Sequence, residues 1–142
     1  MTHREATVEI QVPFHDLDPM QVTWHGNYLR YFEVARCALL ESFDYNYPEM
    51  EASGYLWPIV DLKVKYVRPA VLNQALLVTA KLTEFQNRLG MSYEVRCKET
   101  GACMTKGKTV QVAVDKSSGE MQFVSPQVLF DKLGEPWPYS AQ

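Results

Sequence analysis

The segment from residue 27 to about residue 44 constrains the fold most, because it is the longest stretch in which apolar residues recur with helical spacing. Intervals of three or four residues place one apolar group on a single helical face: Tyr28, Phe32, Ala35, Leu39 and Phe43. Leu29, Val34 and Leu40 fall outside that face. The helix therefore has a wide apolar arc, and we expect it to be buried on several sides.

The segments on either side of this helix alternate between apolar and polar residues, which is typical of strands with one buried face. The pattern predicts strands at residues 6–14, 60–66, 76–82, 91–97, 104–114 and 121–124, with Gly107 as a bulge in the fifth. A last short helix is expected to be capped by Ser125, to start at Pro126 and to end at Gly134.

One long helix followed by strands with short turns predicts an α+β fold, in which an antiparallel β-sheet packs against that helix. Parallel winding is disfavoured, because no second long helix separates the later strands. The length of 142 residues suits a single domain, 1–142. A sheet of this size leaves edges or a face to be covered, and a homo-oligomer is the natural remedy.

Composition excludes several functional classes. The formal net charge is -3 and the basic residues are scattered, so no nucleic-acid footprint is present. The first ten residues lack the long uncharged apolar core of a signal peptide, and no apolar run is long enough to span a membrane. Three cysteines without paired metal-type spacing suit free thiols in a reducing compartment. We therefore expect a cytoplasmic protein without a membrane span.

Reactive polar side chains gather directly before the long helix, where His15, Asp16, Asp18 and His25 fall within eleven residues. The unpaired N–H groups at a helix N-terminus carry partial positive charge and can hold an anion or a developing oxyanion. These residues could also be a metal site of mixed nitrogen and oxygen ligands, but none of the spacings specific to zinc or di-metal sites is present. Asp18 before Pro19 could equally be a turn residue whose carboxylate bonds its own backbone.

The order of these motifs resembles a known family. A strand is followed by Asp16-Leu17-Asp18-Pro19, then by Trp24-His25-Gly26-Asn27-Tyr28, then by Phe32-Glu33 and Ala35-Arg36 in the helix. This pattern is similar to the hotdog-fold acyl-CoA thioesterases of the 4-hydroxybenzoyl-CoA thioesterase and YbgC type, over about residues 8–124. The resemblance implies a hotdog fold, in which the antiparallel sheet wraps around one long helix.

The resemblance also implies roles for individual residues. Asp18 matches the catalytic carboxylate of the family, as nucleophile or as general base. His25 matches the position whose backbone N–H polarises the thioester carbonyl, while the role of its side chain is left open. The substrate is expected to contact the neighbouring motif residues Trp24, Gly26, Asn27 and Tyr28. Asp16 is expected to hold the loop or to keep Asp18 in place.

The expected function is hydrolysis of an acyl-CoA or acyl-carrier-protein thioester by a homodimer or homotetramer, without a cofactor or a metal. Surface cations are candidates for contact with the CoA nucleotide: Lys65, Arg68, Arg88, Lys106 and Lys108. Tyr28, Tyr31, Trp57 and Tyr66 are candidates for an aromatic pocket, although aromatic residues are equally ordinary in a core. Two alternatives remain open: a hotdog dehydratase or hydratase that acts on 3-hydroxyacyl or enoyl thioesters, and a non-catalytic oligomer that binds acyl thioesters.

Overall fold

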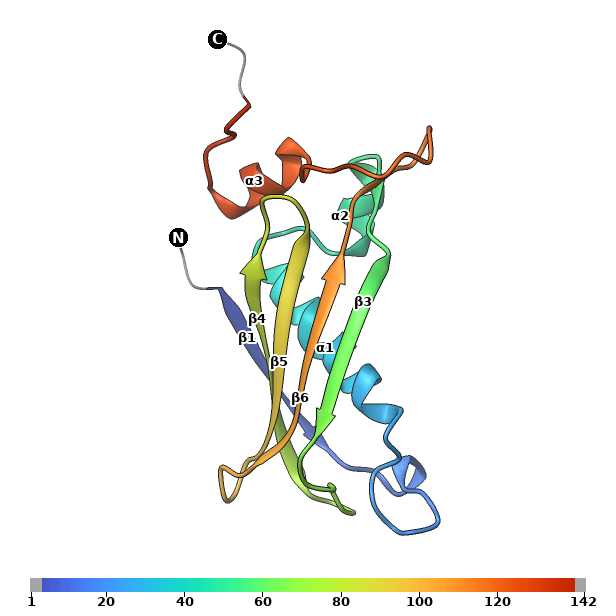
Figure 1. Cartoon of the computed structure of the whole chain (residues 1–142). Coiled ribbons are helices and arrows are strands. Elements are labelled where there is room, and N and C mark those ends of the chain that lie inside the picture. Colours follow the sequence, from blue (N-terminus) through green and yellow to red (C-terminus); the bar gives the residue numbers. More distant parts are fainter. Residues whose placement is uncertain (1–3, 140–142) are drawn as a thin grey trace.

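A five-stranded antiparallel sheet curves around one long helix in the computed structural model, which describes residues 4–139 (Figure 1). The helix α1 spans Asn27–Ser42, and the strand order is β1-β4-β5-β6-β3. The strands are β1 (Glu5–Gln11), β3 (Ile59–Tyr66), β4 (Ala75–Glu84), β5 (Leu89–Cys97) and β6 (Cys103–Gln111). The predicted α+β architecture with an antiparallel sheet is therefore present.

Short elements complete the chain. They are the 3-10 helix η1 (Phe14–Asp16), the helices α2 (Tyr47–Ala52) and α3 (Gln127–Leu133), and the strand pair β2 (Tyr55–Leu56) and β7 (Val114–Asp115). In Figure 1, α3 covers the end of the sheet that lies opposite the loop before α1. None of the described helices combines the length and the apolar character that crossing a bilayer requires.

The core forms where the predicted face of α1 meets the sheet. Tyr28, Phe32, Ala35, Leu39 and Phe43 are all buried. The ring of Phe32 stacks on that of Tyr93 in β5, with centroids 4.6 Å apart. This part of the prediction is confirmed.

The wider burial predicted for α1 is wrong in part, because Leu29 and Val34 are exposed while Leu40 is buried. The sheet covers one side of the helix, and the side with Leu29 and Val34 faces solvent.

The first strand is shorter than the predicted range 6–14, because β1 ends at Gln11. The chain then turns at Pro13 into η1, and this turn leaves Phe14 exposed rather than inward-facing.

Gly107 is not a bulge. It pairs in register with Val64 on β3 and with Tyr93 on β5. A Cβ atom at this position would lie 2.5 Å from the ring of Phe32. The glycine is therefore needed because α1 approaches the middle of β6 closely.

Two predictions near the C-terminal end are also wrong in detail. Residues 121–124 form no strand, and Met121 makes only an isolated bridge to Val114. The cap of α3 is Pro126 rather than Ser125, and the helix starts at Gln127. Gly134 ends α3 as predicted, in the left-handed conformation with φ 71°.

Candidate active site

The loop between β1 and α1 is a narrow hairpin fixed at both ends. The N–H of Trp24 donates to the carbonyl of Asp16 at 2.9 Å, and Leu17 forms an isolated bridge with Thr23. At the tip, the N–H of Asp18 donates to the carbonyl of Val22 at 2.9 Å. A further bridge joins Val22 to Val71, so the hairpin is attached to the segment that follows β3.

Asp16 anchors this hairpin to α1. Its buried carboxylate accepts hydrogen bonds from Tyr31 at 2.6 Å and from Arg30 at 2.5 Å. Burial raises the pKa of Asp16, but the bonds from Arg30 and Tyr31 outweigh that effect and leave the pKa below its ordinary value. The carbonyl of Asp16 also accepts from the Asn27 side chain at 2.9 Å. The predicted loop-holding role of Asp16 is confirmed.

The Asp18 carboxylate both stabilises a turn and borders a cavity. One carboxylate oxygen, Oδ1, accepts hydrogen bonds from the N–H groups of Met20 at 2.8 Å and Val22 at 3.4 Å, as expected for a residue that starts a turn. Within residues 4–139, no partner is found for the second oxygen. The half-buried side chain also borders a cavity, so the turn contacts leave one oxygen available to a ligand.

The cavity has a volume of about 300 Å³ and lies between the hairpin, the start of α1 and the end of β3. Its lining residues are Asp18, Met20, Val22, Thr23, His25, Tyr28, Tyr66, Val67, Arg68 and Pro69. The cavity wall is largely apolar, and it also contains the polar side chains of Asp18, His25 and Arg68. An apolar cavity with a few polar groups is typical of a small-molecule site.

His25 lies at the start of α1, which begins at Asn27 with Gly26 as its cap and has no capping side chain. The carbonyl of His25 accepts from the hydroxyl of Tyr66 at 3.0 Å, and this bond ties the helix start to the end of β3. Among the described residues, the backbone N–H groups of His25 and Gly26 have no acceptor. They are the unsatisfied donors that a helix N-terminus leaves for a ligand.

Three of the six predicted site residues line the cavity together: Asp18, His25 and Tyr28. The other three have structural contacts instead. Trp24 covers Gly26, where a Cβ atom would lie 2.2 Å from the indole ring. Asn27 binds the Asp16 carbonyl and accepts from Arg30. The binding roles of Trp24, Gly26 and Asn27 stay predictions.

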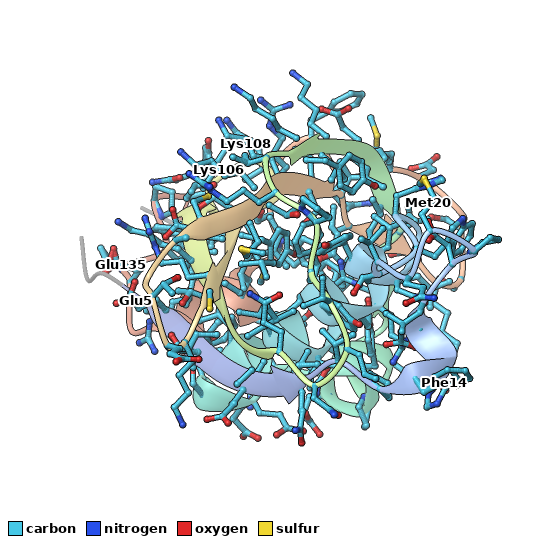
Figure 2. The ribbon with its side chains drawn as sticks, turned by 90° about the horizontal axis from the view of Figure 1, so that it is seen from below. Glu5, Phe14, Met20, Lys106, Lys108 and Glu135 are labelled. Carbon is cyan, nitrogen blue, oxygen red and sulfur yellow. The ribbon has the colours of Figure 1, made fainter. Side chains whose placement is uncertain are left out.

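The aromatic and cationic residues proposed for the pocket likewise divide into some that line the cavity and some that do not. Tyr31 bonds Asp16 and Trp57 donates to Tyr45, so both belong to the core rather than the cavity wall. Of the five candidate cations, Arg68 lines the cavity. Arg88 pairs with Glu84 at 3.0 Å. Figure 2 shows Lys106 and Lys108 projecting away from the molecule.

Some lining residues carried no signal in the sequence. Thr23 is buried on the cavity, and its hydroxyl has no hydrogen-bond partner within residues 4–139. Val67 and Pro69 reach the site from the end of β3, more than forty residues after Thr23. The bridge between Val22 and Val71 and the hydrogen bond from the Thr23 N–H to the Ala70 carbonyl, 2.7 Å long, bring these segments together. Single-sequence patterns do not reveal such contacts.

The family model of the Thioesterase-like superfamily matches residues 12–135. The chain belongs to the Thioesterase-like superfamily. The matched range includes the whole hairpin, α1 and every strand of the sheet except β1, so the cavity described above lies within it.

Several named proteins resemble the chain over most of its length. A Synechocystis protein named "Putative esterase sll0410" is 30% identical over 94% of this chain and 81% of its own length. The long-chain acyl-CoA thioesterase FadM of Escherichia coli is 31% identical over 61% of this chain and 65% of its own length. The DHNA-CoA thioesterase of Staphylococcus aureus superposes with a TM-score of 0.75 at 26% identity, over 82% of this chain and 78% of its own. The fold is thus the hotdog fold of thioesterases, as predicted.

Proposed function

We propose that the protein hydrolyses acyl-CoA thioesters in the cavity beside Asp18 and His25. As a member of the Thioesterase-like superfamily, with relatives named acyl-CoA thioesterases, the protein is a thioester hydrolase. The choice of CoA as the acyl carrier, the roles of the two residues and the 4-hydroxybenzoyl-CoA thioesterase or YbgC subfamily belong to the proposal.

One observation carries the proposal: a carboxylate with a free oxygen and a helix start with unpaired N–H groups border the same cavity. Thioester hydrolysis needs an oxygen that attacks the carbonyl carbon and donors that stabilise the oxyanion formed by the attack. Asp18 supplies or activates the first, and the N–H of His25 supplies the second. A pre-oriented donor of this kind contributes roughly 3 kcal/mol to the transition state.

Two routes are compatible with this arrangement. Asp18 can remove a proton from a water molecule that attacks the carbonyl carbon, after which the C–S bond breaks and the thiolate of CoA leaves. Asp18 can instead attack the carbonyl carbon itself, so that the C–S bond breaks, CoA leaves as the thiolate and a mixed anhydride forms. Water then hydrolyses this anhydride to the free acid and regenerates the Asp18 carboxylate. In both routes the hydrogen bonds from Met20 and Val22 fix one carboxylate oxygen and thereby orient the other.

The remaining elements of the proposal concern the whole protein. The single domain 1–142 acts as a homodimer or homotetramer in the cytoplasm and requires no cofactor or metal. Within residues 4–139, no group of three or more metal-binding side chains is found. Arg68, on the cavity wall, is the cation placed best to meet a phosphate of the CoA nucleotide.

The test is release of free thiol from a panel of acyl-CoAs by the wild type and by Asp18→Asn. The asparagine oxygen can still accept from Met20 and Val22, so the turn is kept while the charge is lost. We expect kcat to fall at least about a hundredfold with little change in melting temperature.

Asp115→Asn is the matched control, because Asp115 also accepts backbone hydrogen bonds in a turn but does not line the cavity. It should leave turnover unchanged. A change in enoyl absorbance without thiol release would favour the dehydratase alternative. Binding without turnover by the wild type would favour the non-catalytic one.

A further inference from the structure

The hydrogen bond from the Tyr66 hydroxyl to the His25 carbonyl, 3.0 Å long, acts on more than the oxygen that accepts it. The carbonyl of residue 25 and the N–H of residue 26 belong to one conjugated peptide group. A donor on the oxygen therefore also changes the charge on the Gly26 N–H. In Figure 1 the end of β3, where Tyr66 lies, is beside the start of α1.

The Gly26 N–H is one of two adjacent donors that the start of α1 leaves unpaired. The backbone of Gly26 is already helical, with φ -66° and ψ -22°. Its N–H therefore points out of the N-terminal end of the helix, as the N–H groups of a first turn do. Within residues 4–139, neither the Gly26 N–H nor the His25 N–H before it has an acceptor. Two donors are thus left for one oxygen.

A third group shows independently that the cavity beside His25 is built for a ligand with hydrogen-bonding atoms. Thr23 lies on the cavity wall and is only 5% exposed. Among the described residues, its hydroxyl has no hydrogen-bond partner. Buried polar groups are rarely left unpaired, so such a group on a cavity wall indicates that a ligand pairs with it.

We infer that Tyr66 is a positioning residue that strengthens the Gly26 N–H as a second donor to the oxyanion, beside the N–H of His25. A hydrogen bond accepted by a peptide oxygen draws electron density from the peptide nitrogen, so the N–H becomes a stronger donor. The phenol keeps its proton throughout. The inference rests on the proposed function, because the oxyanion belongs to thioester hydrolysis.

The phenol is the main source of this polarisation. The His25 carbonyl also accepts from the N–H of Tyr28, but that contact is 3.4 Å long, whereas the contact with Tyr66 is 3.0 Å long. Hydrogen bonds weaken as they lengthen. The start of the helix by itself therefore gives this peptide group only a weak donor, and Tyr66 supplies the stronger one.

The neighbouring peptide group provides an internal comparison. The His25 N–H belongs to the same peptide group as the Trp24 carbonyl, which accepts from the backbone N–H of Asn27 at 2.9 Å. Tyr66 makes no hydrogen bond to that group. Loss of the Tyr66 hydroxyl should therefore weaken the second oxyanion donor and leave the first unchanged.

Other contacts hold the ring and the helix start when the hydroxyl is removed. The Tyr66 ring packs edge-on against the rings of Tyr28 and His25, with centroids 5.5 and 6.1 Å away. The Asp16 carbonyl accepts from the Asn27 side chain at 2.9 Å. Tyr66→Phe therefore keeps the packing and removes only the bond that polarises the peptide group.

Backbone NMR of the wild type and of Tyr66→Phe tests the polarisation without turnover. We expect the amide proton of Gly26 to move upfield, and to move further than that of His25. Tyr47→Phe is the matched control, because the Tyr47 hydroxyl also bonds a side chain of α1, that of Glu33, but does not line the cavity. It should move neither proton. A Gly26 proton that stays in place, or moves no further than that of His25, overturns the inference.

Steady-state kinetics with an acyl-CoA test the effect on catalysis. One oxyanion donor contributes about a hundred- to a thousandfold to kcat, and a linked hydrogen bond strengthens a donor by about 10–30%, so Tyr66→Phe should lower kcat roughly two- to eightfold. KM and the melting temperature should stay unchanged, and Tyr47→Phe should change neither constant. A raised KM with unchanged kcat would show that the phenol contacts the substrate instead, and an unchanged kcat would also overturn the inference.

Fluorinated tyrosines incorporated at residue 66 separate polarisation from a mechanical tether. At a pH where every phenol is protonated, kcat should rise from Tyr66→Phe to the wild type and then to the monofluoro and difluoro forms, because a more acidic phenol donates more strongly. The Gly26 amide shift should follow the same order. Equal kcat across the three phenols would mean that the bond only holds the helix, and would overturn the inference.

The two kinds of measurement keep this inference distinct from the proposed function. A wild type that releases no thiol would refute the proposed function and, with it, the catalytic part of the inference. The order of the Gly26 amide shifts would still decide whether the Tyr66 hydroxyl polarises the peptide group. Normal turnover with no trend in either measurement would refute the inference alone.

Discussion

Asp16 and Asp18 are two residues apart, but they differ in burial and in hydrogen-bond partners and therefore in their roles. Asp16 is buried and accepts charged and neutral donors from α1, so its carboxylate is fully occupied. Asp18 has two backbone donors on one oxygen and a cavity beside it. Asp16 therefore holds the hairpin in place, whereas Asp18 keeps one carboxylate oxygen available to a ligand in the cavity.

Replacing the anchor should lower stability in a pH-dependent way. Asp16→Asn loses charge-assisted bonds, which contribute about 1.5–3 kcal/mol each. Because the pKa of Asp16 is lowered in the folded state, its contribution is present above the ordinary value of 3.8 and is lost as the pH falls below it. Urea unfolding at several pH values should therefore show the difference between the two proteins shrinking in acid. A constant difference would contradict this account.

Arg68 gives a second residue-scale prediction. If it meets a phosphate of the substrate, Arg68→Ala should raise KM by up to about fivefold, the effect of a solvent-exposed charge pair, and leave kcat unchanged. Steady-state kinetics with an acyl-CoA measure this directly. Arg88→Ala is the control, because Arg88 pairs with Glu84 and does not line the cavity.

At the scale of elements, the position of α1 over the sheet depends on one close approach. The Phe32 ring lies between Gly107 and Tyr93, and a Cβ atom at residue 107 would also lie 3.2 Å from the Lys63 carbonyl. A Cβ atom at residue 107 would therefore require the stacked Phe32 ring or the backbone of β3 to move, and both are held by their own contacts. This contact fixes the middle of α1 on the sheet, while the bonds of Asp16 and Tyr66 fix the helix start and the backbone of His25.

Gly107→Ala should therefore destabilise the protein by about 1–3 kcal/mol through overpacking. Chemical denaturation measures the change. The double variant with Phe32→Leu, which removes the ring from the contact, should lose less than the sum of the two single variants. Additive losses would mean that the clash is relieved elsewhere.

Elements were predicted where local pattern and tertiary environment agree. The helix face of Tyr28, Phe32 and Leu39 depends on spacing alone and was predicted correctly. Gly107 was misread as a bulge, because the reason for a glycine there is the ring of Phe32 in the helix, seventy-five residues earlier in the chain. The alternation in β3 predicted a strand but not the exposure of seven of its eight residues, because a local pattern does not reveal which segments cover a strand. Asp18 and His25 could be named from the motif, whereas Thr23 and Pro69 required the fold.

At the scale of the whole molecule, the aromatic contacts of α3 and the candidate site lie at opposite ends of the sheet. Helix α3 packs on the turn between β4 and β5 through the rings of Phe130 and Phe85, 5.3 Å apart. The hairpin between β1 and α1 lies at the other end of the sheet (Figure 1). Changes at one end should leave the geometry of the other intact.

Phe130→Ala should accordingly cost about 3–5 kcal/mol of unfolding free energy, as for other buried aromatic residues. At a temperature where the variant is fully folded, kcat/KM should equal that of the wild type. Thermal unfolding and steady-state kinetics on the same sample provide both values. A parallel loss of turnover in folded protein would show that the two ends are coupled.

The bridge between Val22 and Val71 has a consequence for biosynthesis. Both sides of the cavity depend on a contact between residues nearly fifty positions apart, and such long-range closure is slow compared with helix formation. A nascent chain that has emerged from the ribosome only as far as α1 contains Asp18 and His25 but lacks the opposite wall. On the proposed function, we therefore expect the growing polypeptide to stay inert toward thioesters until the segment after β3 has been made and has docked.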